Sequence, residues 1–159
     1  MSDVSEDELA AFIGPRAPYY LRAWRSLSAH QTNFGGVNRA AFFCSAAWLL
    51  YRRLYRLAAI FLGVVLLESI VSAALFRHRG VPTPVSYDLL TTAIYATVAG
   101  LFANRWYYHH ARGRITALKN RGIRSPAALA EQGGTSWLAP IVGILAALLL
   151  LRLGLGLVL

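Results

Sequence analysis

One carboxylate, Glu68, lies in the middle of a long apolar stretch, where a charge is costly unless protein or water surrounds it. The chain has three long apolar stretches. Counted from their ends, Tyr95 and Arg152 lie about as deep in the second and third stretches as Glu68 lies in the first. We therefore expect Glu68 and Arg152 to meet inside a helical bundle, with Tyr95 as a hydrogen-bond donor. Such a group could carry protons or gate an ion. A structural ion pair that fixes helix register, or an Arg152 side chain that reaches outward, is the simpler interpretation.

The other residue types that commonly do chemistry are scattered. His109 and His110 are adjacent, and adjacent helical positions face different directions, so they do not converge on one metal ion. Cys44 is the only cysteine, which excludes an internal disulfide. The chain has no glycine-rich phosphate loop, no Ser–His–acid order, no HExxH motif and no carboxylate cluster. We therefore predict no catalytic residue, no metal and no cofactor, and a protein that is not an enzyme.

Aromatic and basic residues gather instead in three short segments. Tryptophan, tyrosine and arginine are typical of the boundary between the hydrocarbon core of a membrane and water. The candidates for an interfacial or partner-binding surface are Tyr19, Tyr20, Trp24, Trp48, Tyr51, Arg52, Arg53, Arg105, Trp106, Tyr107 and Tyr108.

Three apolar stretches are long enough to cross a bilayer as helices, at residues 57–76, 86–104 and 137–159. About 20 helical residues cover the hydrocarbon core, and each stretch carries a single charged residue. Water cannot satisfy backbone groups there, so each stretch should be helical. The chain is 57% hydrophobic and 14% charged, which also indicates a membrane protein. We expect an all-α integral membrane protein with three transmembrane helices.

We place the membrane domain at residues 36–159, with one further helix at residues 39–55. Its apolar part is too short to span, and it ends in the basic run Arg52-Arg53-Leu54-Tyr55-Arg56. We expect it to lie on the membrane surface or to enter the membrane without crossing; an extra hairpin through the bilayer is the less favoured alternative. Small residues four apart, such as Ala96 and Gly100, predict close helix contacts.

Residues 1–35 should form a cytoplasmic N-terminal helical segment. Ser5 and Glu8 have the spacing of a capping box, and Gly14-Pro15 should end the first helix. On the second helix Tyr20 and Trp24 share a face. That face could lie on the membrane or pack on the cytoplasmic ends of the spans, and we favour packing. Later in the chain, Ser125-Pro126 should start a short helix that Gly133-Gly134 ends.

The distribution of positive charge predicts the orientation. The net charge is +9, from 16 Lys and Arg against 7 Asp and Glu. Most of the basic residues precede the first span or lie between the second and third spans. By the positive-inside rule, the N-terminus and the second connection are cytoplasmic and the C-terminus lies on the other side. We expect the bilayer to be the anionic partner of this charge, and no binding of nucleic acid.

Three groups of residues resemble an uncharacterised family of small bacterial inner-membrane proteins, known as domain of unknown function 2628. The groups are Phe12-Ile13-Gly14-Pro15 with Tyr19-Tyr20-Leu21-Arg22-Ala23-Trp24; Ala40-Ala41-Phe42-Phe43 with Trp48-Leu49-Leu50-Tyr51-Arg52-Arg53-Leu54-Tyr55; and Ala103-Asn104-Arg105-Trp106-Tyr107-Tyr108 with Gly133-Gly134-Thr135-Ser136. The resemblance covers roughly residues 12–136 and implies a multi-pass protein of the bacterial inner (cytoplasmic) membrane. With the orientation predicted from the charges, the C-terminus would be periplasmic. In that family a Gly-Pro pair typically precedes the tryptophan. Here the positions read Cys44-Ser45-Ala46-Ala47, so the sequence does not predict the kink of such a pair.

Together these patterns favour a small, non-enzymatic integral inner-membrane protein. We expect an accessory or assembly subunit of a larger membrane complex, which binds other membrane proteins or copies of itself through exposed helix faces. The alternative is an oligomeric channel or transporter component in which Glu68 lines the path. A membrane-bound enzyme ranks last.

Overall fold

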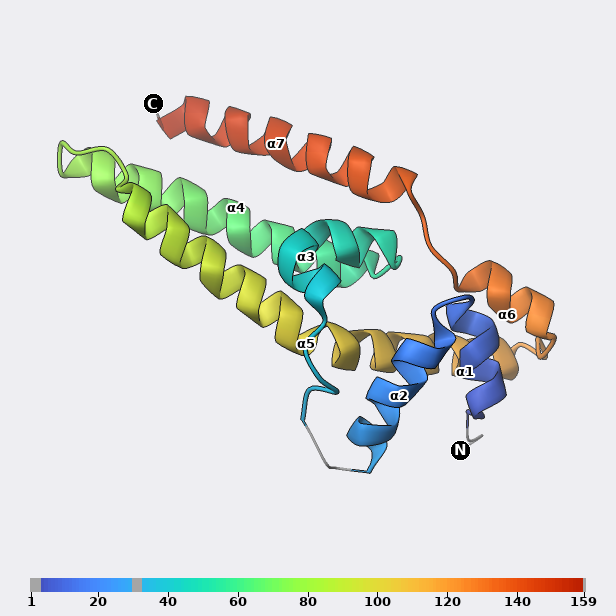
Figure 1. Cartoon of the computed structure of the whole chain (residues 1–159). Coiled ribbons are helices and arrows are strands. Elements are labelled where there is room, and N and C mark those ends of the chain that lie inside the picture. The colour runs from blue at the N-terminus through green and yellow to red at the C-terminus, as the bar shows by residue number, and fades with distance from the viewer. Residues whose placement is uncertain (1–3, 30–32, 159) are drawn as a thin grey trace.

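The computed structural model describes residues 4–29 and 33–158, and within these residues the chain is entirely helical (Figure 1). The elements are α1 (Glu6–Ile13), α2 (Ala17–Ser28), α3 (Arg39–Tyr51), α4 (Tyr55–His78), α5 (Val85–Asn120), α6 (Pro126–Gln132) and α7 (Leu138–Val158). Helices α4 and α7 lie side by side and run in the same direction, whereas α5 returns in the opposite direction (Figure 1). The all-α class predicted from the sequence is confirmed.

Two helices, α4 and α5, are long and apolar enough to cross a membrane. In α7 the apolar helix counted over the described residues, Leu138–Gly154, is shorter than either of these two helices. The expectation of three spans is therefore met in part: two candidate spans are present, and the third remains a prediction. Burial is low in both candidates, because only 6% of the most apolar stretch of α4 and 11% of that of α5 are covered by the rest of the chain.

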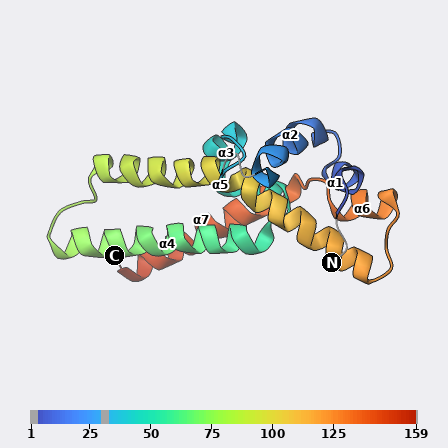
Figure 2. The same ribbon diagram turned by 90° about the horizontal axis from the view of Figure 1, so that it is seen from below.

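Helix α5 continues well beyond the predicted span of residues 86–104. It has 36 residues, which corresponds to about 54 Å at about 1.5 Å per residue. Helices α1 and α2 pack against its second half, and α6 packs against α1 (Figure 2). The helix runs past Ala117 and ends at Asn120, before Gly122.

The helix ends follow the capping residues of the sequence. Ser5 and Glu8 form the predicted capping box, with Ser5 N donating to Glu8 Oε2 at 2.8 Å and Glu8 N donating to Ser5 Oγ at 3.2 Å. At α6, Ser125 Oγ accepts from Ala128 N at 3.3 Å, and Pro126 fills the first position. These side chains satisfy amide groups that have no partner inside the helix.

The predicted helix at residues 39–55 is two helices. Helix α3 ends at Tyr51, Arg53 adopts a left-handed conformation with φ 61°, and α4 begins at Tyr55. The turn is closed by Leu54 N, which donates to the Leu49 carbonyl at 2.9 Å, a pattern in which glycine usually takes the left-handed position. Within α3, Ser45 has φ 36° and ψ −108° and kinks the helix. The kink is thus present without a Gly-Pro pair.

Glycines allow α3 to approach its neighbours. A Cβ atom on Gly100 would lie 2.9 Å from Cβ of Phe42, and one on Gly143 would lie 2.5 Å from Cδ1 of Leu50. A side chain at Gly100 would require the α3 backbone to shift, because Cα of Phe42 would also lie only 3.3 Å away, whereas at Gly143 the flexible end of Leu50 would have to move. The four-residue spacing of small residues predicted such contacts, and the structure places them between α3 and both α5 and α7.

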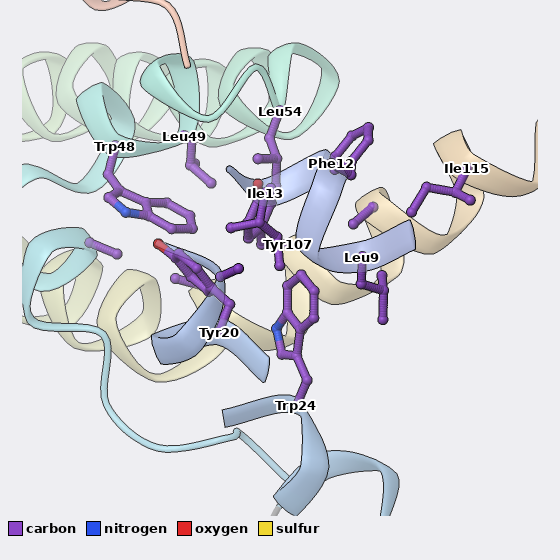
Figure 3. Close-up of a cluster of buried hydrophobic side chains, with 14 of the residues drawn as sticks. Leu9, Phe12, Ile13, Tyr20, Trp24, Trp48, Leu49, Leu54, Tyr107 and Ile115 are labelled. Atoms are coloured by element: carbon purple, nitrogen blue, oxygen red, sulfur yellow. The ribbon is translucent and has the colours of Figure 1, made fainter. Parts of the chain in front are cut away.

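The buried core lies where α1, α2 and the end of α3 meet the second half of α5 (Figure 3). Its largest fully buried side chains include Tyr107, Phe12, Ile13, Leu49 and Ile115. Tyr20 and Trp24 are also buried, which confirms that this face of α2 packs on α5. The tight packing is therefore concentrated at one end of the molecule, and the apolar helices extend from it.

Candidate functional site

The structure does not bring together the three polar residues expected inside the bundle. Glu68 Oε1 accepts a hydrogen bond from the Tyr87 hydroxyl at 2.7 Å, and the Tyr95 ring contacts Phe61 instead, with the centroids 5.9 Å apart. Arg152 is exposed and forms no ion pair among the residues that the structure describes.

The rotation of α7 explains this difference. Gly154 faces α4, because a Cβ added there would lie 2.6 Å from Cδ1 of Ile70. Arg152 lies two residues earlier, about 200° around the helix, so it points away from α4. Gly154 lies beside Ile70, so Arg152 and Glu68 occupy similar positions along α7 and α4, but the Arg152 side chain does not point toward Glu68. Their depth in a membrane stays a prediction.

A half-open pocket of about 830 Å³ lies between α2, α3 and the start of α7. Its walls are made of aromatic side chains, arginines and small apolar residues, without any aspartate or glutamate. They are Arg16, Tyr19, Tyr20, Val37, Asn38, Arg39, Ala40, Cys44, Ala47, Trp48, Tyr51, Arg52, Trp137 and Pro140. Five of the residues selected from the sequence for an interfacial surface are among them.

Arg52 is the most unusual residue of the pocket. Its side chain leaves the turn after α3, and the residue is only 5% exposed. The guanidinium carbon lies 4.7 Å from the centroid of the Tyr20 ring and 5.1 Å from that of Tyr107, within the range of a cation–π contact. Its Nε has no hydrogen-bond partner, and no carboxylate lies within 4.0 Å of Arg52 in the part of the chain that the structure describes.

The tyrosines around Arg52 do not neutralise its charge. Burial raises the pKa of Tyr20, and the nearby Arg52 guanidinium offsets this rise only in part. The Tyr20 hydroxyl therefore stays protonated near neutral pH. The rings stabilise the cation through their π faces, so the pocket keeps a full positive charge in a poorly solvated place.

A network around Asn104 positions these elements. Asn104 is fully buried on α5; its Oδ1 accepts from Asn38 Nδ2 at 3.0 Å, and its Nδ2 donates to the carbonyls of Gly35 and Gly36 at 3.0 and 3.1 Å. Trp24 Nε1 donates to the Asn104 carbonyl at 3.0 Å. Asn38 also caps α3 by accepting from Ala41 N at 3.0 Å. Asn104 thereby links the start of α3 and the Trp24 side chain of α2 to α5.

The remaining interfacial candidates support the pocket or lie beside it. Trp24 and Tyr107 are buried beneath it, with their ring centroids 5.4 Å apart, and Trp48 contacts Tyr107 edge to face at 6.2 Å. The Tyr108 ring lies near that of Trp24, and Trp106 stacks on Phe102. The two arginines bind backbone carbonyls: Arg53 Nη1 donates to that of Glu131, and Arg105 Nη1 donates to that of Asn33. Sequence reasoning selected the aromatic and basic residues. It missed Asn38 and Asn104, whose only signal was an amide at the border of an apolar stretch.

The comparison with known protein families decides where the chain belongs. The family model described as "Protein of unknown function (DUF2628)" matches residues 32–112, about half of the sequence. The chain belongs to the DUF2628 family. The DUF2628 match includes α3, α4, Arg52, Asn38 and Asn104, whereas Arg16, Tyr19 and Trp137 lie outside it. No curated protein and no solved structure matches the chain.

Proposed function

We propose that this DUF2628 protein is a non-enzymatic, multi-pass protein of the bacterial inner membrane and an accessory or assembly subunit of a larger membrane complex. Its N-terminal helices and the α5–α6 connection would face the cytoplasm, and its C-terminus the periplasm. The observation that carries the proposal is the exposure of the apolar helices that extend from the compact end of the molecule.

Helix α4 shows this exposure most clearly. Large apolar residues recur on one face at spacings of three and four, and each is between 46% and 65% exposed; they are Ile60, Val64, Leu67, Val71 and Leu75. An uncovered stripe of this length is rare on a soluble monomer and marks a surface that lipid or another protein covers. Three loosely associated helices enclose no path of their own, which favours a subunit that binds neighbours over one that works alone.

The orientation has support from the charges and from the direction of the helices. The arginines that surround the pocket and the basic residues that follow the predicted span in α5 lie at the same end of the molecule, where the positive-inside rule places the cytoplasm. Helix α7 runs parallel to α4, so a span in α7 would carry the C-terminus to the opposite side (Figure 1).

A site-specific photo-crosslinker at Leu67 tests the proposal in cells. Leu67 is 65% exposed on the α4 stripe, and Leu90, which is 60% exposed on α5, provides a matched control on another helix. We expect the crosslinker at Leu67 to give one defined protein adduct that the crosslinker at Leu90 does not give. When the protein is extracted in native-lipid discs, native mass spectrometry should show a complex that contains the same crosslinked partner. Lipid adducts alone at both positions, with a monomeric mass, would contradict the proposal.

One observation favours the second candidate, an oligomeric channel or transporter component. The hydrogen bond from Tyr87 to Glu68 places a carboxylate between two candidate spans. In liposomes, such a component would show proton or ion flux that Glu68→Gln abolishes and Asp88→Asn, a change of an exposed acid at the start of α5, leaves intact. Absence of flux from the unmodified protein would leave Glu68 as a structural partner of Tyr87.

A further inference from the structure

We propose that the pocket between α2, α3 and the start of α7 is a binding site for a phosphate group, carried by a phospholipid headgroup or free in solution. The site does not depend on the identity of a protein partner. Its defining feature is Arg52, a buried guanidinium that lines the pocket and faces no carboxylate in the described chain.

The first argument is charge. An arginine that is 5% exposed ordinarily has an acidic partner, because a buried, uncompensated cation is unfavourable. Here Arg16 and Arg39 add two further cations to the lining, which contains no acid at all. An anion is therefore the group that the pocket lacks.

The second argument is the geometry of Arg52. Tyr20 and Tyr107 contact its guanidinium through their ring faces, and the Nε group is left without an acceptor. The N–H groups of a guanidinium lie in its plane, where they match the oxygens of a phosphate or carboxylate. The tyrosines thus hold the arginine in place and leave its Nε without an acceptor.

The third argument favours a phosphate that belongs to an amphiphile. Trp48, Trp137 and Ala47 form apolar parts of the wall, and Trp137 is 76% exposed at the mouth. The residues that follow it on α7, Leu138 and Ile141, are exposed and apolar. The cationic pocket is therefore continuous with an apolar helix surface, which suits a lipid whose headgroup enters and whose chains lie along α7.

Alkylation of Cys44 provides a direct test, because Cys44 lines the pocket and is the only cysteine of the chain. The rate of Cys44 alkylation is measured on the purified full-length protein in zwitterionic micelles. One arm adds short-chain phosphatidylglycerol and the other adds inorganic phosphate, and sodium chloride keeps the ionic strength equal in all samples. We expect the bound ligand to slow the alkylation of Cys44, and this effect to saturate as the ligand concentration rises. Slowing by the lipid alone assigns a headgroup site, and slowing by inorganic phosphate assigns a site that also takes a free anion. No slowing in either arm would overturn the proposal.

Matched arginine variants separate a built site from general attraction to a basic surface. Arg16→Gln with Arg39→Gln removes two exposed charges from the lining, and Arg121→Gln with Arg124→Gln removes two exposed charges outside it. We expect the first pair to weaken binding by about tenfold or more and the second pair by less than about twofold. Equal weakening by both pairs would overturn the proposal.

A third variant, Arg52→Met, separates a role of the Arg52 charge in ligand binding from a role in folding. Replacement of a buried, unpaired charge by an apolar side chain of similar length is expected to leave the midpoint of thermal unfolding unchanged or raised. The same variant should lose protection of Cys44 by the ligand. A folded Arg52→Met protein that still binds with unchanged affinity would contradict the role of Arg52.

Discussion

At the scale of single residues, the hydrogen bonds of buried polar groups determine how the helices of the compact end are positioned relative to one another. Asn104 makes hydrogen bonds with Asn38 and with the carbonyls of Gly35 and Gly36. Its backbone also receives the Trp24 side chain. Three segments, at Trp24, residues 35–38 and Asn104, meet at this residue, so loss of its side-chain amide should loosen residues 35–38 from α5.

Asn104→Ala is predicted to lower the free energy of unfolding by about 2–4 kcal/mol, because it removes the buried hydrogen bond with the Asn38 amide and those to the Gly35 and Gly36 carbonyls. Tryptophan fluorescence during unfolding in mild detergent measures the change, since Trp24 lies in the network. Asn120, an exposed residue at the end of α5, is the control, and Asn120→Ala should change the value by less than about 0.5 kcal/mol. A similar loss from both variants would count against the network.

The kink of α3 leads to a prediction of opposite sign. Ser45 has φ 36°, a conformation that glycine adopts without steric strain. Ser45→Gly should therefore raise the free energy of unfolding by about 1 kcal/mol, whereas Ala46→Gly, at a helical position beside it, should lower it by about 0.5–1 kcal/mol. The same detergent unfolding assay measures both. Destabilisation by both changes would show that Ser45 is not strained.

At the scale of elements, α1 is held on α5 by an ion pair that responds to pH. Lys119 Nζ lies 2.9 Å from Glu8 Oε1, and both side chains are mostly buried. The hydrogen bond from Lys119 lowers the pKa of Glu8, with a further contribution from the Ser5 amide. A carboxyl whose pKa is lower in the folded than in the unfolded chain stabilises the fold above its unfolded pKa, and this stabilisation is lost as the pH falls through the folded value.

Hydrogen exchange of the α1 amides should therefore increase, relative to an unstructured peptide, as the pH falls below about 4.5, the ordinary value for Glu8. Glu8→Gln should raise exchange already at neutral pH and remove most of the pH dependence. Glu6→Gln changes the fully exposed pair with Arg25 and should leave exchange near that of the unmodified chain. If Glu6→Gln and Glu8→Gln had equal effects, the Lys119 contact would not hold α1.

Much of the element structure could be predicted from local signals. Ser5, Gly14, Ser125 and Gly133 mark the observed helix ends, and the aromatic face of α2 indicated its packing. Rotation about a helix axis was harder, because almost every face of α7 is apolar and no pattern selects the side toward α4. The direction of the Arg152 side chain could therefore not be predicted. Arg52 was selected as an interfacial residue, but its burial depends on Tyr20 and Tyr107, which come from two other helices.

At the scale of the whole molecule, the chain separates into two parts with different surfaces. The compact end carries the buried aromatic residues, the arginine-lined pocket and many of the cations, whereas α4 and the first half of α5 expose apolar side chains along their length. This division supports the proposal that the apolar helices lie in a bilayer and the compact end outside it. The proposed phosphate site lies where the two parts meet.

The central claim is that α4 and α5 cross the bilayer as an antiparallel pair, with the compact end inside the cell. The most direct test uses single cysteines in a Cys44→Ser background, at Val81 in the α4–α5 turn and at Arg121 after α5, both of which are exposed. A membrane-impermeant maleimide added to intact spheroplasts should label Val81→Cys, and should label Arg121→Cys only after the membrane is opened. Labelling of both from the outside, or recovery of the chain in the soluble fraction, would contradict the account.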